Sequence, residues 1–455
     1  MSERSFDVVV IGAGPAGEVC AGRLADAGLE VAIVEQHLVG GECSFYGCMP
    51  SKALLRPGQA LAEARRIPGA AQAVTSDLDV PAALERRDEV IHHLHDDVQI
   101  PWLEDRGIAL VRGRGRVTGE RTVQVGDETL VARRSVVIAT GTEPLVPPIP
   151  GLREARPWTN REAVTAEQVP PSLVVLGGGT VGVEMADAYA SFGSRVTVIE
   201  AGPRVLAREE PFAGDEVCAA FAEAGIEVRA DTRATAVSRA DGRVTIELDD
   251  GTSVSGDEIL VAVGRHILSA DLGLDDLGVE PGRAIEVDET LRVPGHDWLY
   301  VIGDANGRAL LTHMGKYQGR IAADCILGRD VPLRSDRGLS PRVTFTDPQV
   351  AAVGHTLASA QEAGIDARAV DVPTGGNAGG SFVGRGAPGT ARIVVDEERR
   401  VIVGATFTGA EIAEALHAAT IAVIGEVSLD DLWHAVPCFP TRSELWLKLL
   451  EEYGM

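Results

Sequence analysis

Apolar runs that end in clustered glycines are the clearest pattern in this sequence. The mainly apolar run Asp7–Ile11 predicts a buried strand. It leads into the glycine-rich turn Gly12–Gly17, a predicted helix over Glu18–Ala27 and a second strand over Val31–Glu35. Strand, helix and strand in this order predict a parallel βαβ unit.

The same order returns about 165 residues later in the chain. A strand is predicted over Ser172–Leu176, a glycine-rich turn follows at 177–182, a helix runs to Phe192, and another strand is expected over Arg195–Glu200. Two such units this far apart predict two nucleotide-binding domains rather than an array of short repeats. The fold class is therefore expected to be α/β.

Other apolar runs predict further strands over Arg134–Thr140, Glu258–Val263 and Leu299–Ile302. The proline-rich segment Thr142–Gly151 is expected to connect two domains. Arg65–Pro101 is expected to be helical with a polar face. From about Leu333 the strands and helices carry no nucleotide motif, which predicts a separate C-terminal domain.

Composition and charge narrow the functional classes. The chain has 455 residues, 45% hydrophobic and 24% charged, as in ordinary soluble α/β proteins. A net charge of −25 argues against nucleic acid or an anionic membrane as partner. The sequence has no recognisable targeting segment and no membrane-spanning run, so we expect a cytoplasmic protein. Its six cysteines are then expected to be buried thiols or redox groups.

Each glycine turn is followed by an acidic residue at the end of the second strand. Glu35 and Glu200 each stand 18 residues after the last glycine of their turn, where a carboxylate hydrogen-bonds ribose hydroxyls. A carboxylate at position 200 would repel a 2′-phosphate, so NADH is preferred over NADPH. Arg204 lies close enough in sequence to weaken that preference, and NADPH stays open.

The segment GGECSFYGCMPSK at 40–52 carries two cysteines, Cys43 and Cys48, near the start of a predicted helix. A helix N-terminus lowers the pKa of a thiol and favours the reactive thiolate. A dithiol placed there can take electrons from a reduced flavin and pass them on by thiol–disulfide exchange. Two buried small residues would be the ordinary interpretation of this spacing alone; the surrounding residues overturn it.

With that segment the chain resembles the pyridine nucleotide–disulfide oxidoreductases, the family of dihydrolipoamide dehydrogenase, glutathione reductase, mycothione reductase and mercuric reductase. Further family motifs occur along essentially the whole chain: GGGTVGVE, ATGTEP, VAVGR, YVIGDANG, LTHMGKYQGR and FTDPQVAAVG. The resemblance implies two Rossmann-like domains plus a C-terminal α+β dimerisation domain. The implied boundaries are 1–150 for the FAD domain, 151–265 for the NAD(P) domain, 266–332 for a central segment completing the FAD domain, and 333–455 for the interface domain.

The resemblance also implies a role for individual residues. Cys48 would lie against the flavin, Cys43 would be the interchange thiol, and Lys52 would sit near the flavin, paired with Glu184. The implied FAD site consists of Gly12, Gly14, Gly17, Glu35, Gly41, Lys52, Gly115, Thr140, Gly141, Asp304 and Thr312. The implied nicotinamide-nucleotide site consists of Gly177, Gly179, Gly182, Glu200 and Gly264. Hydride would pass from NADH to FAD and electrons from there to the dithiol, within a homodimer whose active sites combine both subunits.

The C-terminal segment departs from the family. Related disulfide reductases end in an HPTxSE-like motif whose histidine serves the partner subunit's cysteines as acid and base. Here the segment is PCFPTRSE, so Phe439 occupies the histidine position while Glu444, the residue that orients it, remains. Phenylalanine cannot transfer a proton, and such help is worth roughly 10²–10⁴-fold in rate. His434, Cys438 or a substrate group stay open as proton donors, although Cys438 is expected to be a buried, inert thiol.

Three functions follow from this departure. The first is a flavin-dependent disulfide oxidoreductase with an atypical acid–base site. The second is an NAD(P)H reductase of quinones or metal ions acting directly from the flavin, and the third is a slow-turnover redox-sensing flavoprotein. His92, His93 and His95 with Asp96 and Asp97 are expected on one helix, where a solvated face is favoured over a metal site. We therefore expect no resident metal, and a small-molecule electron acceptor as the substrate.

Overall fold

The computed structural model describes residues 2–329 and 331–455, and it has the α/β class that the sequence predicts. The chain forms two compact units. The first unit holds the chain up to Pro50, Arg87–Pro144 and Arg265–Arg337. The second unit holds Ser51–Arg86, Leu145–Gly264 and Gly338–Met455. Each unit is assembled from three separate stretches of chain.

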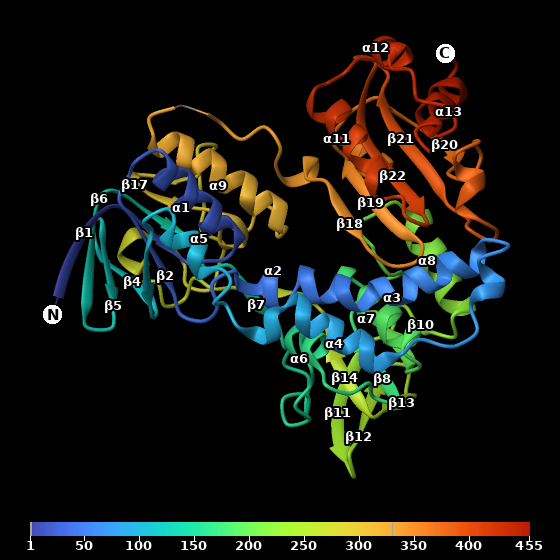
Figure 1. The fold of residues 1–455 in the computed structure, drawn as a ribbon, viewed down its shortest axis with the longest axis horizontal. Helices are drawn as coiled ribbons and strands as arrows, with labels where there is room; N and C mark the ends of the chain where they lie inside the picture. The colour runs from blue at the N-terminus through green and yellow to red at the C-terminus, as the bar shows by residue number, and fades with distance from the viewer. Residues whose placement is uncertain (1, 330) are drawn as a thin grey trace. The chain divides into compact units, whose positions relative to one another are not determined.

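The first unit is organised around a sheet with five parallel strands in the order β17–β6–β1–β2–β3 (Figure 1). These strands are β1 (Ser2–Ile11), β2 (Val31–Glu35), β3 (Ala109–Arg112), β6 (Glu128–Ile138) and β17 (His296–Val301). All five residues of β2 are buried, as expected for a parallel strand covered on both faces. The carboxyl ends of β1, β2 and β6 therefore meet at one edge, where this fold binds ligands.

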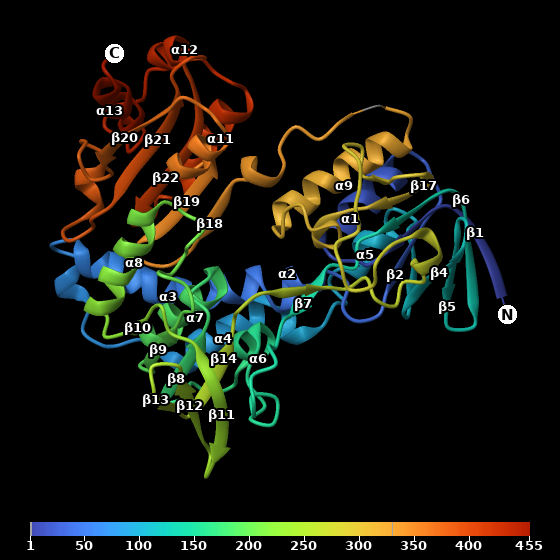
Figure 2. The same cartoon turned by 180° about the vertical axis from the view of Figure 1, so that it is seen from behind.

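Two helices of the first unit, α1 (Pro15–Asp26) and α9 (Thr312–Ile326), pack side by side against this sheet (Figures 1 and 2). Glycine allows their close approach, because a Cβ atom on Gly319 would stand 2.6 Å from the carbonyl oxygen of Ala16. A Cβ atom on Gly315 would stand 3.2 Å from the Ala16 side chain. The core between helices and sheet includes Leu24, Val137 and Ile321.

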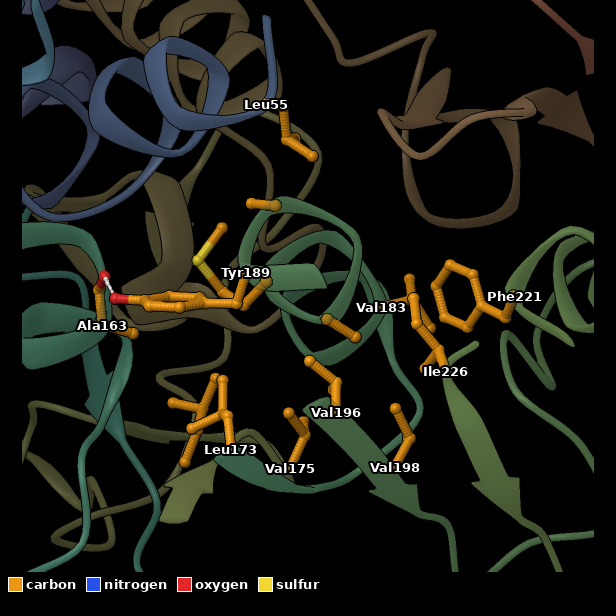
Figure 3. Packing of buried hydrophobic residues seen from close by; sticks show 14 of the residues in the cluster. Leu55, Ala163, Leu173, Val175, Val183, Tyr189, Val196, Val198, Phe221 and Ile226 are labelled. Carbon is orange, nitrogen blue, oxygen red and sulfur yellow. Dashed lines mark hydrogen bonds between the residues drawn. The ribbon is translucent and has the colours of Figure 1, made fainter. Parts of the chain in front are cut away.

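The second unit contains a four-stranded parallel sheet in the order β10–β9–β8–β14. Its elements are β8 (Ser172–Leu176), α7 (Thr180–Ser191), β9 (Arg195–Ile199), α8 (Pro211–Glu223), β10 (Glu227–Arg229) and β14 (Glu258–Val261). Figure 3 shows how Val175, Val196 and Val198 of the strands pack beneath the helices. The buried Tyr189 hydroxyl donates a hydrogen bond to the carbonyl oxygen of Ala163, 2.7 Å away.

A five-stranded antiparallel sheet, also in the second unit, has the order β18–β19–β22–β21–β20. Its elements are β18 (Arg342–Thr344), β19 (Gln349–Gly354), β20 (Ala367–Pro373), β21 (Thr390–Asp396), β22 (Val401–Gly409), α10 (Leu357–Glu362), α11 (Leu416–Ile424), α12 (Leu429–His434) and α13 (Glu444–Tyr453). The helices α11 and α13 share one core cluster with this sheet, and Figure 1 shows them lying along it. This sheet and its helices have the α+β organisation that the resemblance implies for the C-terminal part of the chain.

The remaining elements include further strands of the first sheet, a three-stranded antiparallel sheet, a two-stranded antiparallel sheet and several helices. They are α2 (Gly41–Phe45), α3 (Cys48–Arg66), α4 (Val80–Val90), α5 (Ile100–Glu104), β4 (Gly115–Gly119), β5 (Thr122–Val125), β7 (Thr142–Pro144), α6 (Asn160–Thr165), β11 (Ala234–Ala240), β12 (Arg243–Leu248), β13 (Ser253–Gly256), β15 (Arg265–Ile267) and β16 (Arg292–Val293). Over residues 2–329 and 331–455, no helix is both long and apolar enough to cross a membrane.

The predicted helix over Arg65–Pro101 is wrong as a continuous element. The chain there breaks into the end of α3, a short 3₁₀ turn, α4 and a second 3₁₀ turn at His92–Leu94. His92 and His93 have φ near +50°, a conformation that no α-helix contains, so the histidines do not share a helical face. Asp96 accepts a hydrogen bond from the Val39 amide and pairs with Arg112 instead, which gives it a structural role.

Candidate active site

The first glycine turn leaves an open approach to backbone amides. Gly12 has φ of +108°, which glycine adopts at no steric cost, and a Cβ on Gly17 would collide with the carbonyl oxygen of Gly12. No atom lies within 4 Å of a Cβ built on Gly14, at the residue before α1 begins. An exposed helix N-terminus with free space in front of it fits the pyrophosphate of a dinucleotide.

The predicted partners of this turn lie around it. Both oxygens of the Glu35 carboxylate accept backbone hydrogen bonds, from the Ala13 amide at 2.8 Å and the His37 amide at 2.7 Å, which fixes it beside the turn. Gly41 lies against Gly14, because a Cβ on Gly41 would stand 2.9 Å from the Gly14 Cα. Gly115 packs on Ile11, and Thr140 donates to the carbonyl oxygen of Leu268. The first unit thus brings these residues together around the turn, and their role in holding FAD stays a prediction.

The second glycine turn, in the second unit, repeats this construction. Gly177 has φ of +107°, and a Cβ on Gly182 would collide with the Gly177 carbonyl oxygen. The Glu200 carboxylate accepts from the Gly178 amide at 2.5 Å and from the Gly202 amide at 2.6 Å. No atom lies within 4 Å of a Cβ built on Gly179 or on Gly264. This open space before α7 is where a nicotinamide nucleotide is predicted to bind, and each residue's role there stays a prediction.

The cysteine pair stands where two short segments of the first unit meet. Cys43 lies in α2, Cys48 is the first residue of α3, and both are partly buried thiols that share a hydrogen bond. The Sγ atom of Cys48 lies 3.2 Å from the Oγ1 atom of Thr312, the first residue of α9. The hydrogen bond with Cys48, followed by burial, raises the pKa of Cys43, while Thr312 and the charge of Lys316 lower it.

Arg265 joins two acidic residues of the first unit in one network. Its Nε donates to the Thr142 hydroxyl at 2.6 Å, and its Nη2 lies 3.3 Å from the Glu42 carboxylate. The Thr142 hydroxyl in turn donates to Asp304 at 2.7 Å. Burial raises the pKa of Asp304, whereas the Thr142 hydrogen bond and the Arg265 charge lower it. Sequence reasoning missed Arg265, although it directly follows Gly264 in the motif VAVGR.

Lys52 and Glu184 form an ion pair in the second unit. The Nζ atom of Lys52 lies 2.8 Å from Glu184 Oε2, and the Glu184 side chain is only 3% exposed. Glu184 Oε1 accepts from the Phe345 amide at 2.9 Å, and the Lys52 ammonium stands 4.8 Å from the centre of the Phe345 ring. The predicted pair is therefore held from two sides. Its relation to the flavin stays a prediction.

The C-terminal motif carries an exposed aromatic residue. Phe439 is 76% exposed, and His434 at the end of α12 is exposed as well. Cys438 is exposed in the loop between α12 and α13, so the prediction of a buried thiol is wrong. Glu444 begins α13, and its Oε2 is buried without a hydrogen-bond partner. These observations are consistent with a carboxylate whose family partner, the histidine, is missing.

The remaining cysteines agree in part with the expectation that cysteines outside the redox pair are buried thiols. Cys20 in α1 and Cys325 in α9 are buried, whereas Cys218 in α8 is only partly buried. Burial raises the pKa of Cys20 to about 12, so this thiol is inert at neutral pH. Among the described residues, no group of three or more His, Cys, Asp or Glu side chains is arranged to hold a metal ion.

Comparisons with known proteins agree with this architecture. Residues 6–319 match the family model described as pyridine nucleotide-disulphide oxidoreductase, and residues 340–449 match its dimerisation domain. The chain is 31% identical to dihydrolipoyl dehydrogenase of Chlamydia muridarum over 452 residues, covering 97% of this chain and 95% of that protein. It is 32% identical to mercuric reductase of Acidithiobacillus ferrooxidans over 444 residues, covering 94% of this chain and 79% of that protein.

A solved structure is similar over nearly its whole length. The Cu(II) complex of the HOCl-induced flavoprotein disulfide reductase RclA from Escherichia coli superposes with a TM-score of 0.86 at 26% identity, covering 98% of this chain and 99% of that one. Enzymes of this family use FAD and NAD(P)H. This chain belongs to the pyridine nucleotide-disulphide oxidoreductases.

Proposed function

We propose that this chain is an FAD-dependent NAD(P)H oxidoreductase whose Cys43–Cys48 dithiol delivers electrons to a small-molecule acceptor, with a disulfide as the first candidate. The observation that carries the proposal is the hydrogen-bonded pair of thiols formed by Cys43 in α2 and Cys48 at the start of α3, with Cys48 Sγ 3.2 Å from the Thr312 hydroxyl. Bound FAD would supply a two-electron carrier between the pyridine nucleotide and this dithiol.

The chemistry of the dithiol is thiol–disulfide exchange. The Cys43 thiolate attacks one sulfur of the acceptor disulfide, a mixed disulfide forms, and the first product thiolate leaves. Cys48 then attacks the Cys43 sulfur, which releases the second product and closes the Cys43–Cys48 disulfide. Two protons end on the two product thiols, so the acceptor is reduced and the pair is oxidised.

The cofactors follow from the two glycine turns. FAD would be held by the first unit, with Glu35 at its adenosine ribose and Asp304 at its ribityl chain. The second turn would hold the nicotinamide nucleotide, with Glu200 beside the ribose. Both oxygens of Glu200 are already held by backbone amides, and a fixed carboxylate disfavours a 2′-phosphate. We therefore expect NADH to be used better than NADPH. Because Arg204 is close in sequence and weakens this preference, NADPH stays open as a second donor.

The acceptor is the open part of the proposal. Phe439 cannot serve as a proton donor, which favours acceptors that need no protein base, or a proton from His434, Cys438 or the substrate. A second candidate is therefore reduction of a quinone or a metal ion directly from the flavin. The mercuric reductase relative and the Cu(II) complex of RclA favour the metal ion among these. A slow redox-sensing flavoprotein is the third candidate.

We also propose that the chain acts as a homodimer in the cytoplasm. The match to the family's dimerisation domain supports the dimer. The exposed Phe439 and Val436, which is 84% exposed, lie in the segment that reaches the partner subunit in the family. The six thiols support a reducing compartment.

Cysteine variants test the function. We expect Cys43→Ser to lower turnover of a small disulfide such as oxidised lipoamide at least 100-fold with saturating NADH, because exchange has lost its attacking sulfur. Cys218→Ala, which removes a thiol from α8, should stay within twofold of wild type. Full turnover of benzoquinone or Cu(II) by Cys43→Ser would support the direct flavin route, and full disulfide turnover would contradict the proposal.

A further inference from the structure

Two ionisable side chains of the first unit, Glu18 and Lys316, stand where α1 crosses α9. The crossing is fixed by the contacts of Gly315 and Gly319 with Ala16. Lys316 follows Gly315 on α9, and Glu18 lies two residues after Ala16 on α1. The charge of Lys316 acts on both Glu18 and Cys43. No predicted role includes Lys316 or Glu18.

Helix geometry directs Lys316 toward the dithiol. Thr312, whose hydroxyl stands 3.2 Å from Cys48 Sγ, precedes Lys316 by four residues on α9. Residues four apart lie on one face of a helix, so the ammonium extends from the same face that contacts the sulfurs. Lys316 is exposed, and its long side chain can reach the thiol while keeping its charge in water.

We propose that Lys316 stabilises the thiolate of Cys43 during exchange. Because position 439 holds phenylalanine and not histidine, Lys316 would supply the positive charge beside the dithiol from the chain itself. This inference rests on the proposed function of the dithiol. A nearby ammonium favours the anionic form of a thiol, and the thiolate is the form that attacks a disulfide. When the Cys43–substrate bond forms and the substrate disulfide breaks, the leaving thiolate also passes close to this positive charge.

Glu18 opposes this effect. Burial raises the pKa of Glu18 to about 7, Lys316 lowers it, and Glu35 raises it. The carboxyl group is therefore divided between its neutral and anionic forms near neutral pH, and the anion would weaken the field of Lys316 at Cys43. On α9, the ionisable residues within four positions of Lys316 are His313, Tyr317 and Arg320, and the thiols of Cys43 and Cys48 come from α2 and α3. Arg320 lies over the Tyr317 ring.

The test is the pH dependence of Cys43 alkylation in the FAD-loaded full chain. Iodoacetamide labelling of the Cys43 peptide is followed by mass spectrometry in a Cys48→Ser background, where one sulfur titrates at the site. Lys316→Met should slow labelling at pH 7 about 3- to 10-fold, because loss of a nearby opposite charge raises a thiol pKa by up to about one unit. Lys316→Arg should restore it, and Glu18→Gln should leave it as fast as wild type or faster.

Lys448→Met is the matched control, because it removes the same charge from α13, where Lys448 pairs with Glu451. Coinciding profiles for wild type and Lys316→Met would overturn the inference, as would a Lys316→Arg profile as slow as that of Lys316→Met. The function is tested separately by Cys43→Ser turnover. If that variant is inactive while Lys316→Met labels normally, the inference alone fails; if Cys43→Ser turns over disulfide fully, the proposed function fails, whatever the labelling shows.

Discussion

The hydroxyl of Thr312 lies 3.2 Å from the sulfur of Cys48, and these two residues are the first residues of α9 and α3. Two helix N-termini therefore meet at the dithiol. Each helix end carries a partial positive charge from its unpaired amides. Both ends favour a thiolate in the same place, which is the local condition that a redox-active cysteine requires.

Removal of the Thr312 hydroxyl should make the dithiol less acidic. The hydrogen bond from Thr312 lowers the pKa of Cys43, so Thr312→Val should raise that pKa and shift the alkylation profile of the reduced protein to higher pH. A hydrogen bond worth about 1 kcal/mol corresponds to roughly a fivefold slower reaction at pH 7. Thr312→Ser keeps the hydroxyl and should react like wild type. Equal rates for Thr312→Val and Thr312→Ser would show that the hydroxyl does not act on the sulfurs.

Loss of the Lys52 ammonium should destabilise the protein through Glu184. Lys52→Met leaves a carboxylate that is 3% exposed with only the Phe345 amide as an observed partner. A buried charge without its counter-ion is costly. Because Lys52 itself is partly exposed, we expect a loss of about 2 kcal/mol in the free energy of unfolding by urea. The double variant Lys52→Met/Glu184→Gln should recover most of it; an additive loss would mean that the pair does not interact.

Asp187 should make stability fall as pH rises toward neutrality. Burial and the neighbouring Asp347 carboxylate raise the pKa of Asp187 to about 7. Between about pH 4 and 7 the folded protein keeps this proton while the unfolded chain has lost it, so the carboxyl group penalises folding increasingly across that window. Asp187→Asn keeps an acceptor for the Asp347 amide and removes the penalty. Its stability relative to wild type should improve by about 2 kcal/mol between pH 5 and pH 8. A constant difference would contradict the raised pKa.

Restoring histidine at position 439 should restore efficient disulfide reduction. General acid–base catalysis contributes roughly 10²–10⁴-fold, and Glu444 still has a buried oxygen without a partner near the start of α13. We expect Phe439→His to raise kcat with oxidised lipoamide at least tenfold and to add a titration near pH 6.5. Phe439→Leu should do neither. An unchanged rate in Phe439→His would mean that the acceptor does not approach the dithiol by the family's route.

Much of the fold follows from local sequence pattern. The predicted strands Val31–Glu35 and Ser172–Leu176 match the observed β2 and β8 residue for residue, because an apolar run bounded by turn residues defines a buried parallel strand by itself. The glycine turns are predictable for a similar reason, because each close backbone contact that requires a glycine lies within about six residues of sequence. The place of Phe439 at the family's histidine position could be recognised because the adjoining Pro-Thr-x-Ser-Glu residues fix the alignment.

Features that depend on distant residues could not be predicted in this way. Arg265 and Glu42 are 223 residues apart, and nothing local links them. The α1–α9 crossing that gathers Glu18 and Lys316 depends on helix packing. The prediction of one continuous helix over residues 65–101 was wrong because the polar pattern there fits several short helices as well as one long helix. The positive φ angles of His92 and His93 occur without a glycine that would indicate them in the sequence. The exposure of Cys438 depends on the surrounding loop, which residue type does not specify.

The central claim is that Cys43–Cys48 is a working redox pair, and an anaerobic titration of the FAD-loaded protein with NADH tests it most directly. After two electrons, we predict that the flavin remains oxidised and that a long-wavelength absorbance band arises from the thiolate beside it, with the band absent in Cys48→Ser. Bleaching of the flavin by the first two electrons, without such a band, would contradict the account and place the acceptor chemistry at the flavin itself.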